Sequence, residues 1–166
     1  KGLPSLLLAV SKITQDENWV LWIEGDGPEI EAYQDLARNY AIAHRCRFLG
    51  FCQYDLHSWL MRSADVVIVP SLQDNWGIVV DEALQLGKPV ISSDATGSGY
   101  DRIKDQDNGF IFPAGDTNAL LSILKSLLSS KHNRDFISQN AKNKSYVCPK
   151  DNLNTLLNLM EADVDD

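Results

Sequence analysis

The stretch at residues 65–90, DVVIVPSLQDNWGIVVDEALQLGKPV, decides the fold that we expect. It opens with an apolar run over 65–69 that stops at Pro70. Such a run, without polar alternation, is typical of a strand that is buried on both faces. A helix is predicted over 77–86 and a second apolar strand over 89–93. Strand, helix and strand in this order indicate a parallel α/β sheet.

The same alternation continues on both sides of this stretch. Short apolar runs that end at glycine or polar residues predict strands, and amphipathic segments between them predict helices. The other expected strands are 19–24, 46–49 and 109–112, and the other expected helices are 3–14, 28–43, 55–62, 116–130, 133–145 and 151–162. We therefore expect residues 1–166 to form one domain, an α/β Rossmann-like parallel sheet with helices on both faces.

Composition excludes several classes of partner. The net charge of −8 argues against nucleic acid, or an anionic membrane surface, as the main partner of this chain. A few local donors can still bind a diphosphate on an acidic protein. Cys46, Cys52 and Cys148 lack a metal-binding spacing, which predicts reduced thiols and a cytoplasmic location. No apolar run is long enough to span a bilayer.

The loop at 70–77 is the most informative candidate site, because ligands of open α/β sheets bind beyond the carboxyl ends of the strands. Gly77 allows a ligand to approach the backbone, and the amides at the helix start favour an anion. Asp74 and Glu82 would repel a phosphate there unless they accept hydroxyl groups instead. A phosphate cradle flanked by two hydroxyl acceptors suits a nucleotide sugar.

Six short motifs follow one another along the chain. They are Lys1-Gly2, Gly25-Asp26-Gly27-Pro28, Phe48-Leu49-Gly50-Phe51, Ala64-Asp65 to Pro70-Ser71, Glu82-Ala83 to Gly87-Lys88-Pro89-Val90, and Asn108-Gly109-Phe110. In this order and spacing they resemble the retaining GT-B glycosyltransferases, and Asp74 and Glu82 fall on that family's Glu-x7-Glu pair. The resemblance covers nearly the whole chain. It implies the carboxy-terminal, donor-binding half of a GT-B fold.

The resemblance also implies roles for individual residues. Glu82 should accept hydrogen bonds from ribose hydroxyls, and Asp74 from hydroxyls of the donor sugar. Lys1 should reach a phosphate oxygen and assist the leaving group, so Lys1 and Asp74 are the catalytic candidates. The remaining donor-binding candidates lie in the loops: the amides of Gly77, Ile78 and Val79 on the diphosphate, Asn75 and Trp76 beside them, Gly50 and Phe51 against the base, and Gly25, Asp26 and Gly27 near the nucleotide. Trp76 is expected mainly to pack its loop.

The sequence departs from the family in two respects. Asp74 is one methylene shorter than the family's Glu, so its reach or sugar preference differs, and an ordinary Asx-turn role stays open. The family's first central strand, between those at 19–24 and 65–69, is missing from this chain, as is the Gly-Arg pair that ends it. A gap would leave backbone groups unpaired on two strand edges, so we expect further chain before Lys1 in the natural protein.

These observations lead to one main expectation. The chain is expected to be the donor domain of a glycosyltransferase in polysaccharide biosynthesis, with retaining transfer from a nucleoside diphosphate sugar to a glycan or lipid-linked acceptor. The amino-terminal acceptor domain is absent from this chain, so the isolated domain should be nearly inactive. No metal or other cofactor is expected. Any peripheral membrane contact, at the inner face of the membrane, would come through the absent domain.

Two alternatives remain at this stage. The chain is also compatible with a non-catalytic nucleotide-sugar-binding module or degenerate transferase and with a flavodoxin-like interaction domain. A sugar-nucleotide epimerase of the same architecture lacks support, because the motif from Glu82-Ala83 to Val90 and the spacing of Asp74 and Glu82 favour transferases. The histidines, His44, His57 and His132, are scattered along the chain. They are interpreted as structural or exposed, and His57 has no evident carboxylate partner in the sequence.

Overall fold

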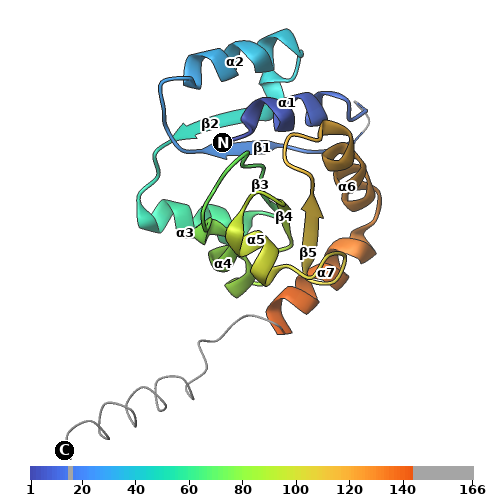
Figure 1. Cartoon of the computed structure of the whole chain (residues 1–166). Helices are drawn as coiled ribbons and strands as arrows, with labels where there is room; N and C mark the ends of the chain where they lie inside the picture. Colours follow the sequence, from blue (N-terminus) through green and yellow to red (C-terminus); the bar gives the residue numbers. More distant parts are fainter. Residues whose placement is uncertain (15–16, 144–166) are drawn as a thin grey trace, which may run out of the picture.

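The structure is a computed structural model that describes residues 1–14 and 17–143. Helices and strands alternate through most of it (Figure 1). The strands are β1 (Leu21–Glu24), β2 (Cys46–Gly50), β3 (Val67–Val69), β4 (Val90–Ser93) and β5 (Gly109–Phe112). The helices are α1 (Leu3–Ser11), α2 (Ile30–Asn39), the 3-10 turn η1 (Ala43–Arg45), α3 (Tyr54–Ser63), α4 (Ile78–Gln85), α5 (Gly97–Arg102), α6 (Thr117–Ser129) and α7 (Lys131–Asn143).

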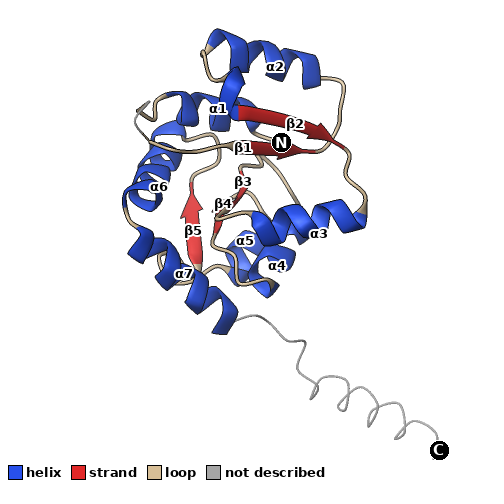
Figure 2. Ribbon diagram, turned by 180° about the vertical axis from the view of Figure 1, so that it is seen from behind, coloured by secondary structure: helices blue, strands red, loops and turns tan. Residues whose placement is uncertain are grey.

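All strand pairs are parallel, and they form two sheets. β1 pairs with β2, while β4 lies between β3 and β5. β1 and β3 are not paired with each other. Figure 2 shows the β1–β2 pair as a unit beside the three-stranded sheet. The finding agrees with the predicted gap between these two strands.

Side chains, not backbone hydrogen bonds, join the two sheets. One hydrophobic cluster contains Ile23 of β1, Ile91 of β4 and Phe112 of β5. Leu7 of α1 and Leu120 of α6 are fully buried in the same cluster. Burial of one such leucine contributes about 1.5–3 kcal/mol. Packing of α1 against α6 therefore holds β1 and β2 in place relative to β3–β5 (Figure 1).

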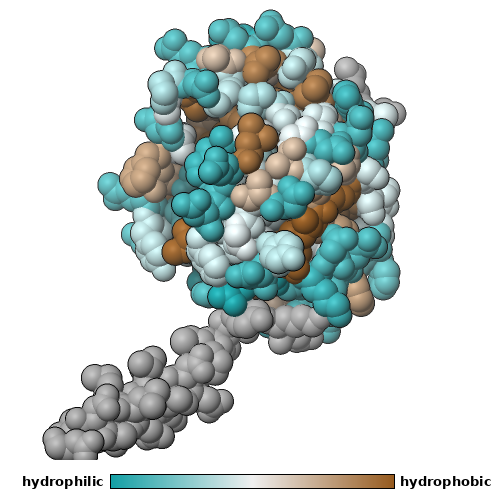
Figure 3. All heavy atoms as spheres, in the orientation of Figure 1, coloured by the Kyte–Doolittle hydropathy of each residue, from teal (hydrophilic) through white to brown (hydrophobic). Residues whose placement is uncertain are grey.

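A second cluster lies under α4. Val80 and Ala83 are fully buried there, against Val90 of β4 and Met61 of α3. Helices cover both faces of the sheets, so the predicted Rossmann-like α/β architecture is confirmed. Figure 3 shows hydrophilic side chains over most of one outer face, with hydrophobic ones interspersed among them. In the part of the chain that the structure describes, no helix has the length and apolar character needed to cross a membrane.

Several details differ from the sequence-based expectation. Helix α5 was not predicted, because its six residues include two glycines and show no apolar period. The helix expected over 28–43 ends at Asn39, and Ala41 has a φ of 57° there. The run 65–69, expected to form a strand buried on both faces, is less buried than predicted: in β3 Val69 is buried, but Val67 and Ile68 are only half-buried. The helix expected over 151–162 lies outside the described residues.

Candidate functional site

The loop 70–77 is shaped by the loop 94–98, which follows β4. Three backbone hydrogen bonds of 2.7–3.2 Å join the loops, from Asp74 to Ala95, from Gly97 to Asp74 and from Ser98 to Trp76. The Ser98 hydroxyl adds a fourth, donated to the Gly77 carbonyl over 2.7 Å. Ser98 is fully buried. Uncharged, mostly main-chain groups thus fix the loop that the sequence singled out.

Gly77 ends this loop and begins α4. Its φ of +77° lies in the left-handed region, and a Cβ at this position would lie 2.5 Å from the methyl group of the buried Thr96. The next amides, of Ile78 and Val79, open the helix and have no partner within it. A glycine is therefore needed where the predicted anion-binding amides begin, and partial positive charge gathers there.

The two predicted catalytic residues are in contact. Lys1 Nζ donates to Asp74 Oδ2 over 3.0 Å, although 73 positions separate them. Gly2 makes the approach possible, because its φ is +76° and a Cβ there would lie 1.7 Å from the Pro70 carbonyl oxygen. The amino-terminal residue thus lies over the end of β3.

The other Asp74 oxygen, Oδ1, accepts the Trp76 amide over 3.3 Å. The Asx turn that the sequence left open is therefore present alongside the ion pair. The hydrogen bond from Lys1 lowers the pKa of Asp74; burial opposes this, and the Lys1 charge and the amides of Trp76 and Gly77 add to it.

Trp76 packs along the start of α4. Its Nε1 donates to Asp81 Oδ2 over 2.8 Å, and Asp81 Oδ1 accepts from Arg102 Nε over 3.1 Å. The Arg102 guanidinium lies 5.3 Å from the centre of the indole ring. The side chain is thus held against α4 and α5, in line with the packing role expected of it, while 41% of the residue stays exposed. Asn75 beside it is exposed.

The loops after β1 and β2 meet as well. The Gly25 amide donates to the Gly50 carbonyl over 2.8 Å, and Asp26 Oδ1 accepts the Gly27 amide over 2.8 Å. Phe51, next to Gly50, is 81% exposed. The structure therefore brings together the residues predicted near the base and the nucleotide. Within the described ranges, no hydrogen bond or ion pair joins them to Lys1 or Asp74.

His57 of α3 links the end of β1 to α4, the helix that follows the loop 70–77. Its Nδ1 lies 2.9 Å from both carboxylate oxygens of Glu24, at the end of β1, and its Nε2 lies 3.2 Å from Glu82 Oε2. Burial lowers the pKa of His57, but the hydrogen bonds and charges of Glu24 and Glu82 together raise it above its ordinary value. His57, which has no evident carboxylate partner in the sequence, thus has two in the structure. No local signal reveals them, because they lie 33 and 25 positions away.

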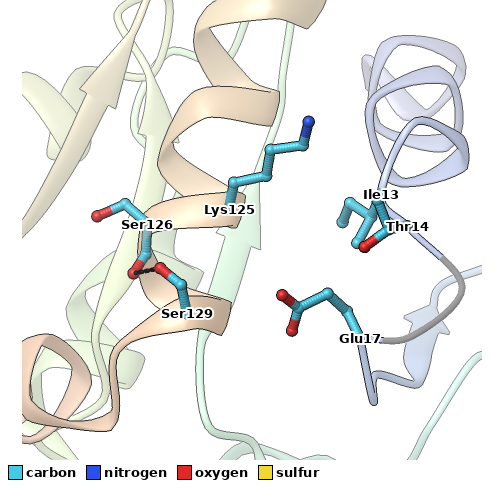
Figure 4. A pocket seen from close by; sticks show the side chains of 6 residues that line it. All are labelled: Ile13, Thr14, Glu17, Lys125, Ser126 and Ser129. Atoms are coloured by element: carbon cyan, nitrogen blue, oxygen red, sulfur yellow. Dashed lines mark hydrogen bonds between the residues drawn. The ribbon is translucent and has the colours of Figure 1, made fainter.

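A hollow of about 360 Å³ lies elsewhere, between the end of α1 and α6. Figure 4 shows Glu17 facing it from one side and the α6 residues from the other. Because Glu17 precedes β1, the hollow lies at the amino ends of the strands, away from the loops described above. Over residues 1–14 and 17–143, no group of three His, Cys, Asp or Glu residues is arranged to hold a metal ion.

Parallel strands, helices on both faces and functional loops at the carboxyl ends define one Rossmann-like domain of a GT-B protein. The chain belongs to the glycosyl transferases group 1 family, whose model matches residues 1–144. An uncharacterized glycosyltransferase of Methanocaldococcus jannaschii is 34% identical over 147 residues, which cover 88% of this chain and 37% of that protein. The chain thus spans little more than a third of the length of this relative.

Solved structures show the same fold. Complexes of Anabaena HepE with UDP and with UDP-glucose superpose with a TM-score of 0.78 at 24% identity, covering 87% of this chain and 40% of HepE. The carboxy-terminal domain of a group 1 family protein from Francisella tularensis has a TM-score of 0.76 at 21% identity. It covers 87% of this chain and 77% of that domain's chain. The predicted carboxy-terminal, GT-B architecture is thus confirmed.

Proposed function

We propose that this chain binds the donor, a nucleoside diphosphate sugar, for a glycosyltransferase that retains the anomeric configuration. The observation that carries the proposal is the Lys1–Asp74 contact beside the opening amides of α4. A cation, a helix start and a carboxylate meet there, which suits a diphosphate joined to a hydroxyl-bearing sugar. The UDP and UDP-glucose complexes of HepE, a protein of the same fold, support this class of ligand.

In the proposed complex, the amides of Gly77, Ile78 and Val79 bind the diphosphate. Lys1 exchanges Asp74 for a phosphate oxygen and stabilises the charge that develops on the leaving diphosphate. Asp74 then accepts hydroxyls of the sugar, and no metal ion is required. Glu82 lies about one helical turn after Ile78 in α4, where it accepts the ribose hydroxyls.

The other partner of the proposed reaction is a glycan or lipid-linked acceptor. It would bind to a second domain, and transfer would take place in the cleft between the two domains, in the cytoplasm or at the inner face of the membrane. Closure of such a cleft excludes water and orients the reactants. Gly25, Asp26, Gly27, Gly50 and Phe51 would contact the nucleoside.

A second candidate function is a non-catalytic nucleotide-sugar-binding module. Asp74 favours it, because one of its oxygens already pairs with Lys1 and the other accepts the Trp76 amide. Hydrolysis and transfer assays on full-length protein that binds the donor separate the two functions. Release of nucleoside diphosphate supports the enzyme, and binding without any release supports the module.

Titration calorimetry with UDP, GDP and ADP tests the shared binding step. We expect one of the three to bind, and Glu82→Ala to weaken it by about 1–3 kcal/mol, the effect of losing hydrogen bonds to buried hydroxyls. Glu31→Ala is the matched control, since Glu31 is an exposed carboxylate on α2. Absence of binding by all three nucleotides, or equal binding by both variants, contradicts the proposal.

A further inference from the structure

His57 stands between two carboxylates that come from different parts of the fold. Glu24 ends β1 and faces Nδ1, while Glu82 lies on α4 and faces Nε2. Figure 2 shows α3, which carries His57, between β1 and α4. A neutral imidazole has one N–H and can donate to only one of these carboxylates, whereas the protonated ring donates to both. Both contacts are therefore hydrogen bonds only when His57 is charged.

The surroundings of His57 support the charged form. Its side chain is 19% exposed, and the carboxylates of Glu24 and Glu82 are the charges that act on it. The nearby Cys52 thiol is affected by the Glu24 charge. Burial, followed by that charge, raises the pKa of Cys52 above 9.0, so the thiol stays neutral while His57 titrates. Loss of the proton from His57 would leave two carboxylates beside one uncharged ring.

Glu82 is held by only one of its oxygens. His57 contacts Oε2, and in the described part of the chain Oε1 has no hydrogen-bond partner. The Glu82 side chain is 37% exposed, so it is free to reorient without such an anchor. Fixing Oε2 therefore selects one direction for Oε1.

We propose that His57 is a positioning residue, which in its charged form orients Glu82 so that Oε1 meets the ribose of the donor. This inference rests on the proposed function, in which Glu82 is the ribose acceptor. It makes donor affinity depend on a residue that touches no ligand atom. When the ring loses its charge, Glu24 and Glu82 compete for its single remaining N–H, so Glu82 is held only part of the time, and the three groups together change from a charge of −1 to −2. Both changes weaken the binding of an anionic nucleotide as pH rises.

The test measures the dissociation constant of the nucleoside diphosphate that binds, among UDP, GDP and ADP, between pH 5.5 and 9. It compares the wild-type protein with His57→Gln, whose amide donates from one nitrogen only and cannot be charged. The terminal phosphate titrates near pH 6 on its own, and this effect cancels in the ratio of the two constants. We expect His57→Gln to bind about fivefold to tenfold more weakly at low pH, the effect of one hydrogen bond, and the ratio to approach one at high pH.

A 2′,3′-dideoxy analogue of the same nucleotide tests the route through the ribose. The difference between wild type and His57→Gln should be several-fold smaller with the analogue, because it lacks the hydroxyls that Glu82 accepts and only the difference in charge remains. A difference that is as large with the analogue as with the natural nucleotide overturns the positioning role, and so does a ratio that does not change with pH. If the wild-type protein binds none of the three nucleotides, the proposed function itself fails.

Glu24→Gln gives a second variant should His57→Gln fold poorly. It removes one charge beside the ring and leaves His57 and Glu82 in place. The fall in affinity should then shift to lower pH, since a histidine with a single carboxylate neighbour loses its proton more readily. An unchanged midpoint overturns the inference.

Discussion

The loop 70–77 and the His57 contacts form two sides of one candidate site, and they are stabilised in different ways. The loop is fixed by main-chain groups and the buried hydroxyls of Ser93 and Ser98. The α3 side is fixed by ionisable groups, Glu24, His57 and Glu82. Uncharged contacts keep their strength over the whole physiological range of pH, whereas contacts to a histidine do not. The comparison teaches that one site can combine a part whose contacts do not change with pH, the loop 70–77, with a part whose contacts do, the α3 side around His57.

The largest effect is expected from Gly77→Ala, which alters the loop 70–77, the constant side of the site. The new methyl group would meet the Thr96 side chain, and alanine is strained at a φ of +77°. We expect the free energy of unfolding to fall by about 1–3 kcal/mol, the range for a strained backbone conformation. Urea unfolding measures it. Gly27→Ala is the control, because a Cβ there has open space and no positive φ, and a loss as large in this variant would contradict the explanation.

A smaller effect, which depends on pH, is expected on the other side of the site. The folded-state pKa of His57 is raised above 6.5, so its contribution to stability is fully present below pH 6.5. That contribution is lost as pH rises through the folded-state pKa. The difference in thermal midpoint between wild type and His57→Gln should therefore shrink with rising pH. His132→Gln, on the exposed surface of α7, should show no such trend, and a matching trend there would refute the assignment.

The smallest effect on stability is expected from Lys1→Met. Lys1 is 79% exposed, and an exposed ion pair contributes about 0–1 kcal/mol. Affinity for the nucleoside diphosphate should nevertheless fall about tenfold or more, because a charge-assisted hydrogen bond to phosphate is lost. Calorimetry beside Lys12→Met, at the far end of α1, separates this effect from the loss of one positive charge. Equal affinities of the two variants would exclude Lys1 from the phosphate site.

The sequence predicts the constant side well because its signals are local. The apolar run before Pro70, the loop that ends at Gly77 and the helix that follows are contiguous, and each has its own chemical signature. The Lys1–Asp74 contact is not local, and it was not predicted: the family resemblance implied only that each of the two residues contacts the donor. Its physical cause, the approach of Gly2 to Pro70, becomes visible only in three dimensions.

The other side shows where sequence-based prediction fails. The register that places Glu24, His57 and Glu82 together depends on how β1, α3 and α4 meet, and no spacing rule connects positions so far apart. Helix α5 was missed for a different reason. It has no apolar period of its own, and the hydrogen bonds of its first turn to the loop 70–77 stabilise it from outside.

The contact between Lys1 and Asp74 has a consequence for how quickly and how tightly a donor can be captured. When a ligand immobilises a lysine side chain that is mobile in solvent, the lost rotamer entropy costs up to about 2 kcal/mol of free energy. Here the ammonium group already rests 3.0 Å from a carboxylate at the mouth of the loop. In the proposed reaction an incoming phosphate replaces Asp74 as the anion beside a cation that already lies at the loop, so part of the ordering of Lys1 precedes binding of the donor.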